Sequence, residues 1–137
     1  MVAAVCGWHA RHGAAAVEIE SRLDRGERMS IAAHAIAETY AVLTRLPAPH
    51  RLAPSDAWTL VRTNFVDNAS LVTLDGAAHV AVLGELAGAS IGGGRTYDAL
   101  IAACAIASRA KTLLTFNRRH FDPPPRGVMI VEPPDPT

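Results

Sequence analysis

The amino-acid sequence predicts an α/β protein with a parallel central sheet and helices on both of its faces. Stretches with helical periodicity alternate along the chain with short apolar stretches of strand length. Half of the residues are apolar (50%) but only 5% are aromatic, which favours helices packed closely on a sheet. Strands that alternate with helices pair in parallel, so we expect functional groups beyond the carboxyl ends of the strands.

The first half of the chain is expected to be mainly helical. Gly26 ends the first helix, and Pro47 stops the second. Pro54 is a good first residue for the third helix, because its fixed φ suits the first turn and its missing N–H costs nothing there. The expected helices are 9–25, 34–46 and 54–65, with a short β-compatible stretch at 28–32.

The second half is expected to contain the clearest strands. Asp75 has the side chain of a helix cap, and the glycines at 92–94 form a hinge before the next helix. Three prolines at 123–125 keep the segment before the last strand irregular. The expected strands are 70–74, 111–115 and 127–131, and the expected helices are 75–87 and 96–109.

Length and composition restrict the protein class. A chain of 137 residues is expected to form one domain over 1–137, with 132–137 as a loose tail. Thirteen basic and thirteen acidic residues give no net charge, so any electrostatic attraction to nucleic acid has to come from local clusters of basic residues.

The two cysteines are expected to be buried and reduced. No apolar run is long enough to span a bilayer and the start does not resemble a signal peptide, so we expect a soluble, cytoplasmic protein.

Asp98 is the most informative polar residue. It lies in the first turn of a helix that is otherwise apolar on nearly all sides. A carboxylate in that position is partly desolvated and needs a cation or hydrogen-bond donors. The helix N-terminus supplies part of this, and Arg95 is a candidate cation. The alternative is an ordinary acidic residue favoured by the helix dipole.

Two further residues are candidates on weaker grounds. Glu38 lies in the middle of a helix, where a contact with His34 on a solvated face is the better explanation when the residue is taken alone. Asn117 directly follows a predicted strand, where it could coordinate a hard cation or simply form a turn. His9 and His12 have a spacing that could suggest zinc, but an exposed helix start is the better explanation.

The segments R95-T-Y-D98-A-L-I-A-A and T112-L-L-T115-F-N117-R-R-H-F121 together resemble the carboxyl-terminal half of PIN-domain toxins of the VapC type. The stretch from Gly127 to Pro133 is similar to the last strand of that family, and Glu38 fits its second acidic position. The resemblance therefore covers almost the whole chain and implies a three-layer PIN-like fold.

The resemblance also implies a function. PIN toxins are metal-dependent endoribonucleases that use Mg²⁺ or Mn²⁺, form homodimers and are neutralised by a cognate antitoxin. It implies Asp98 as a metal ligand, Glu38 as a ligand or as the residue that orients a bound water, and Asn117 at a variable fourth catalytic position. Arg95, Arg118 and Arg119 are expected to contact RNA phosphates, with tRNA or ribosomal RNA as the substrate.

The chain departs from the family pattern at its start. The family's first strand ends in an Asp, but here no acidic residue precedes Glu18. We expect either that the natural start lies upstream of Met1, which we favour, or that the chain is short and cleaves poorly. The second possibility leaves a PIN module that binds antitoxin or RNA without cutting it. A third alternative is a receiver-type regulator. The positions of Asp75 and Lys111 relative to the predicted strands fit it poorly, because Asp75 follows a strand whereas Lys111 begins one.

Overall fold

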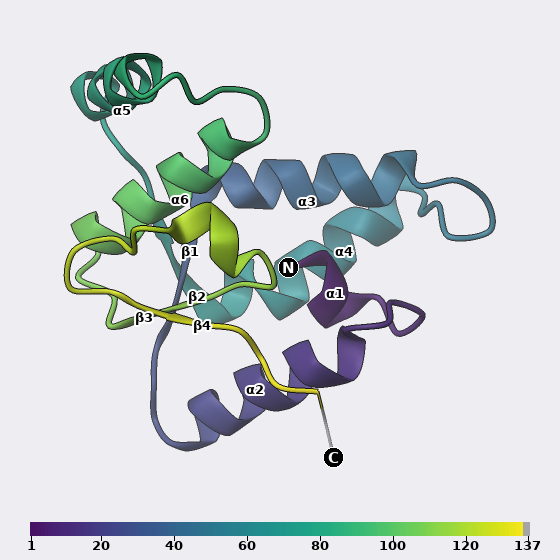
Figure 1. The fold of residues 1–137 in the computed structure, drawn as a ribbon. Helices are drawn as coiled ribbons and strands as arrows, with labels where there is room; N and C mark the ends of the chain where they lie inside the picture. The colour runs from purple at the N-terminus through teal and green to yellow at the C-terminus, as the bar shows by residue number, and fades with distance from the viewer. Residues whose placement is uncertain (136–137) are drawn as a thin grey trace. The chain divides into compact units, whose positions relative to one another are not determined.

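The computed structural model describes residues 1–135 and separates them into two compact units. Unit 1 contains residues 1–71 and the chain end from Pro133, and unit 2 contains residues 72–132. The alternation of helices and strands confirms the predicted α/β class (Figure 1). Among the described residues, the strands pair as two two-stranded sheets. The predicted single domain over 1–137 remains a proposal, and 136–137 of the predicted tail lie outside the described residues.

Unit 1 is mainly helical, and its elements end where the sequence predicted. Gly26 follows the second helix with a φ of 81°, a backbone conformation that glycine adopts without strain. Pro54 is the first residue of the fourth helix. The elements are α1 (Val2–Val5), α2 (His12–Asp24), β1 (Met29–Ala32), α3 (Ala33–Arg45), α4 (Pro54–Asn64), the 3₁₀ turn η1 (Val66–Asn68) and β2 (Ala69–Val72), which pairs with β1 and ends at the unit boundary.

The core of unit 1 lies between α3 and α4. Leu43 and Val61 are completely buried, and Ile31 of β1 and Phe65 pack in the same cluster. Truncating a fully buried leucine costs about 2–5 kcal/mol of stability, so this contact holds α3 in place. The short helix α1 was not predicted, and α2 begins at His12 rather than His9 because residues before it form turns.

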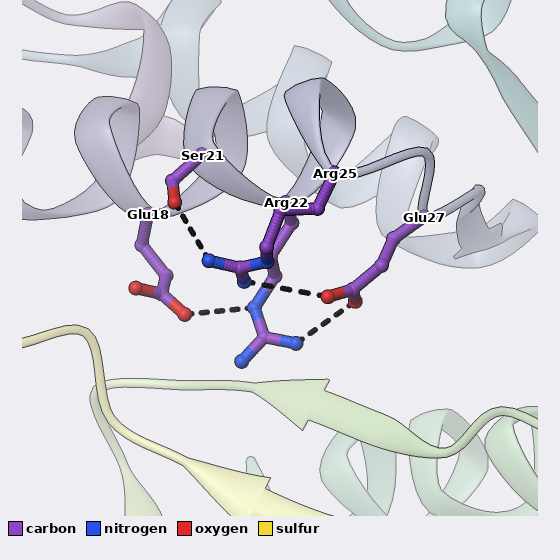
Figure 2. Close-up of polar contacts among 5 residues, drawn as sticks. All are labelled: Glu18, Ser21, Arg22, Arg25 and Glu27. Atoms are coloured by element: carbon purple, nitrogen blue, oxygen red, sulfur yellow. Dashed lines mark hydrogen bonds and ion pairs between the residues drawn. The ribbon is translucent and has the colours of Figure 1, made fainter.

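A cluster of charged side chains near the end of α2 is bonded within itself (Figure 2). Arg22 Nε donates to Glu18 Oε1 at 2.7 Å, and Arg22 Nη1 donates to Glu27 Oε2 at 2.9 Å. Arg25 donates to Ser21 Oγ at 2.8 Å and to Glu27 Oε1 at 3.3 Å. The hydrogen bond from Arg22 lowers the pKa of Glu27, against a smaller opposing effect of burial, and Arg25 lowers it further. We call these five residues the α2 charge cluster.

Unit 2 has its core between a helix and a parallel pair of strands. The register pairs Leu113 of β3 with Ile130 of β4, and both are buried with Ala105, Phe121 and Val128. The connection 115–128 is long enough for the crossover that parallel strands require. The elements are α5 (Gly76–Gly88), α6 (Arg95–Ala107), β3 (Thr112–Leu114), the 3₁₀ turn η2 (Arg118–Phe121) and β4 (Met129–Val131).

Candidate active site

Asp98 lies in the first turn of α6, as predicted. Its side chain is 21% exposed, and the helix behind it buries Leu100, Cys104 and Ala105. The free N–H groups at a helix start favour a negative charge there. The fold therefore presents a carboxylate that is partly shielded from water but still accessible at one end of an apolar helix.

The side chain bonded to Asp98 is His120, 22 residues further along the chain. His120 Nδ1 lies 2.8 Å from Asp98 Oδ2, and the His120 side chain is 28% exposed. An ionised carboxylate only accepts hydrogen bonds, so Nδ1 of the ring has to be the donor. The sequence had suggested Arg95 as the nearby cation. The structure places His120 there instead, because η2 turns back toward the start of α6.

The turn that carries His120 is fixed to the sheet by a series of hydrogen bonds. The backbone N–H of His120 donates to the carbonyl of Asn117 at 2.8 Å, and the N–H of Asn117 donates to Thr115 Oγ1 at 2.9 Å. Thr115 in turn donates its backbone N–H to Val131 at the end of β4 at 3.0 Å. Phe121, next to His120, is buried in the core of unit 2. The turn is therefore held at both ends.

His120 contacts both the side chain of Asp98 and the backbone carbonyl of Asn117. Asn117 lies three residues after the end of β3 and is exposed. Arg118 and Arg119 are exposed on the same turn, and Arg95 is exposed as the first residue of α6. Unit 2 therefore combines oxygen donors with exposed basic side chains.

Glu38 belongs to unit 1, on α3. Its Oε1 lies 3.5 Å from His34 Nε2, which confirms the contact that the sequence suggested. The same Oε1 atom is buried and makes no hydrogen bond within the described part of the chain. A buried carboxylate oxygen without a donor is costly, and it is the kind of atom that a cation would satisfy.

The candidate residues fit a hard divalent cation by the chemistry of their donors. Asp98 and Glu38 offer carboxylate oxygens and Asn117 offers an amide oxygen, which are ligands that Mg²⁺ and Mn²⁺ prefer. Within residues 1–135, no group of three or more His, Cys, Asp or Glu side chains gathers closely enough to hold a metal ion. Mg²⁺ commonly uses one or two protein carboxylates and keeps several waters, so the Asp98 carboxylate within unit 2 is compatible with it.

His120 is the residue that sequence reasoning missed as part of the site. In the sequence it follows Arg118 and Arg119, inside the segment that resembles the PIN-domain family. Its place three residues after Asn117, in a turn after a strand, was the available signal. Sequence position alone does not identify His120 as a contact of Asp98, because that contact depends on how the turn folds back toward α6.

Other reactive side chains give no competing site. Cys6 and Cys104 are both free and buried, as predicted. Burial raises the pKa of the Cys104 thiol, which disfavours the nucleophilic thiolate. His12 Nδ1 lies 3.0 Å from the backbone carbonyl of Ala3, and His9 accepts from the N–H of Arg11. These contacts explain both histidines without zinc.

The fold and the Asp98 group define a class of protein. Residues 1–124 match the PIN domain family, which is most of the chain. The chain belongs to the PIN-domain family, whose three-layer α/β fold is the one predicted from the sequence.

Its relatives place it with the VapC type. It is 38% identical over 113 residues to Ribonuclease VapC40 of Mycobacterium tuberculosis, in strains CDC 1551 / Oshkosh and H37Rv, covering 82% of this chain and 78% of the relative. It is 43% identical over 82 residues to Ribonuclease VapC27 of strain H37Rv, covering 60% of this chain and 58% of the relative. No solved structure gives a significant match.

Proposed function

We propose that this chain is a Mg²⁺- or Mn²⁺-dependent endoribonuclease toxin that a cognate antitoxin neutralises. The observation that carries the proposal is the partly buried Asp98 carboxylate, bonded to His120, whose backbone N–H is in turn bonded to the carbonyl of the exposed Asn117. The names of the relatives, which are ribonucleases, support the reaction class. The family match supports the use of a divalent cation.

In this proposal Asp98 and Glu38 ligate the cation, and Asn117 contributes a neutral oxygen. When bound, the cation would act as a Lewis acid and offset negative charge that develops at the phosphodiester. The chain's own residues bind and orient the RNA. Arg118 and Arg119 lie on the turn that carries His120, and His120 contacts Asp98 of α6. In this proposal the two arginines bind RNA phosphates near Asp98.

The partners follow from the same proposal. We propose RNA as the substrate, with tRNA or ribosomal RNA as the RNA class, and a cognate antitoxin as the regulator. A homodimer and a cytoplasmic location complete the proposal. In the described chain, no helix has the length and apolar character needed to cross a bilayer.

The direct test is RNA cleavage by the 137-residue chain with Mn²⁺, with Mg²⁺ and with EDTA. We expect cleavage with either cation, its loss in EDTA, and a loss of about 100-fold or more in Asp98→Asn and Glu38→Gln, because each change removes a charged ligand. Glu85→Gln in unit 2 and Glu20→Gln in unit 1 are matched controls, since both carboxylates are exposed. Cleavage that persists in EDTA, or that Asp98→Asn leaves unchanged, would contradict the proposal.

A second candidate function is binding of antitoxin or RNA without cleavage. It is favoured by the observation that no group of three potential ligand side chains of the His, Cys, Asp or Glu type forms within residues 1–135. This candidate predicts that the chain retards RNA in a gel with either cation or with EDTA and yields no cleavage product. Loss of that binding in a variant with both Arg118 and Arg119 changed to Ala would support it.

A further inference from the structure

We propose that His120 is a positioning residue that fixes the Asp98 carboxylate for cation binding. The inference rests on the proposed function, because it concerns the same site. His120 stands outside the set of acidic and amide residues expected from the sequence, and its role is argued from the contacts within unit 2.

The first step of the argument is the bond itself. His120 Nδ1 donates to Asp98 Oδ2 over 2.8 Å, between two side chains that are 28% and 21% exposed. A carboxylate can rotate about its last bond, and a donor on one oxygen limits that rotation. The bond engages Oδ2, so we assign the other oxygen, Oδ1, to the cation.

The second step is that the backbone of the turn that carries the ring is held in place. The buried Phe121 fixes one side of its turn in the core. The backbone bond from His120 to Asn117 fixes the other side, and Thr115 connects Asn117 to the end of β4. His120 therefore bonds Asp98 from a turn that is itself hydrogen-bonded to the end of β4.

The third step is the coupling of two proposed ligands. The backbone carbonyl of Asn117 accepts the backbone N–H of His120, and the Asp98 carboxylate accepts the side-chain N–H of the same residue. His120 thus connects the Asp98 carboxylate to the backbone of Asn117, which is 19 positions away in sequence, from 98 to 117. Residues that hydrogen-bond a metal ligand commonly change metal affinity by about 10–100-fold when they are replaced.

The test measures Mn²⁺ binding to the full chain, by the electron paramagnetic resonance of free Mn²⁺. His120→Phe keeps a ring but removes the donor, and we expect it to weaken Mn²⁺ binding about tenfold or more. His120→Asn keeps an amide donor near the place of Nδ1, and we expect binding within about threefold of the unchanged chain. His79→Phe is the matched control, because His79 contacts only the backbone carbonyl of Asp75 among the bonds recorded for it in unit 2.

A second readout separates positioning from a direct role on RNA. In His120→Phe, higher Mn²⁺ concentrations should restore the cleavage rate, while the KM for RNA stays within about twofold of the unchanged chain. A raised KM for RNA would overturn the proposal, because it assigns His120 to RNA binding. A rate that stays low at saturating Mn²⁺ would also overturn it.

A measurement on the unchanged protein covers the case in which His120→Phe does not fold. Long-range ¹H–¹⁵N spectra at pH 8 should show the His120 ring protonated at Nδ1, as the bond to Asp98 requires. A ring protonated only at Nε2 would overturn the proposal without any variant.

The outcomes also separate this inference from the proposed function. If the unchanged chain binds Mn²⁺, Asp98→Asn does not, and His120→Phe binds as tightly as the unchanged chain, only the positioning role is overturned. If the unchanged chain binds no Mn²⁺, the metal site and the positioning role are both overturned.

Discussion

The α2 charge cluster and the Asp98–His120 pair contain hydrogen bonds of similar length, but the bonded residues are separated by very different distances along the chain. The bond between Arg22 and Glu18 is 2.7 Å long and that between His120 and Asp98 is 2.8 Å long. The first joins residues four positions apart on one helix, and the second joins residues 22 positions apart on different elements. Proximity along the chain therefore produces one bond, and tertiary folding produces the other.

The carboxylates of the two regions are also used differently. Glu27 accepts guanidinium N–H groups on both of its oxygens, from Arg22 and from Arg25. The bond from His120 engages only Oδ2 of Asp98. Both oxygens of Glu27 are therefore engaged by guanidinium groups, whereas the bond from His120 leaves Oδ1 of Asp98 for another partner. The following predictions test that division.

The largest effect on stability is expected from Arg22→Met. The change keeps the packing of the aliphatic stem but leaves Glu18, whose side chain is only 18% exposed, without its guanidinium partner. We expect a loss of about 1–2 kcal/mol in the free energy of unfolding, measured with urea, and no change in RNA cleavage. Arg11→Met is the control, because the Arg11–Asp135 pair is exposed and is worth less than about 1 kcal/mol. A loss of RNA cleavage in Arg22→Met with unchanged stability would contradict this prediction, because it would assign the α2 charge cluster to cleavage rather than to stability.

Asn117→Asp tests the Asp98 region, through its affinity for Mn²⁺. The change adds a negative charge at the exposed residue that begins the turn carrying His120, so we expect Mn²⁺ to bind about tenfold more tightly, which is about 1.4 kcal/mol. Calorimetric titration with Mn²⁺ measures this. Ser55→Asp, which adds a charge at the exposed start of α4, should leave Mn²⁺ affinity unchanged. Equal affinities for Asn117→Asp and the unchanged chain would remove Asn117 from the site.

Asp75→Ala tests a carboxylate of unit 2 that acts by local capping. Asp75 Oδ1 accepts the backbone N–H of Ala78 at 2.8 Å at the start of α5. Its loss should cost about 1 kcal/mol of stability, and Asp75→Asn should restore most of it, since asparagine also caps helices well. Thermal unfolding measures both variants. Mn²⁺ binding should not change, and weaker binding in Asp75→Asn would show that the two carboxylates are coupled.

The smallest effect concerns acid stability. The hydrogen bond from Arg22 lowers the pKa of Glu27 from its ordinary value of 4.5. A carboxyl with a lowered pKa in the folded state contributes stability above its unfolded pKa and loses it as the pH falls through the folded pKa. Urea unfolding from pH 6 to pH 3 should therefore show a shallower fall for Glu27→Gln than for the unchanged chain. Identical slopes would mean that the exposed Glu27 contributes no measurable stability.

The sequence predicted the elements of the fold well, because their signals are local. Gly26, Pro54 and Asp75 set helix ends that the structure confirms, and the apolar stretches at 111–115 and 127–131 contain β3 and β4. The short α1 was missed, because four apolar residues carry no helical periodicity that distinguishes them from a strand.

The sequence by itself determined that Asp98 begins an apolar helix and that Asn117 follows a strand. The bond between Glu18 and Arg22 also follows from local spacing, because residues four positions apart on a helix are neighbours. Only the tertiary structure decided that His120, rather than Arg95, is bonded to Asp98. The physical reason is that the parallel register of β3 and β4, with Phe121 in the core, sets the direction of η2, and no pattern confined to one element records that direction.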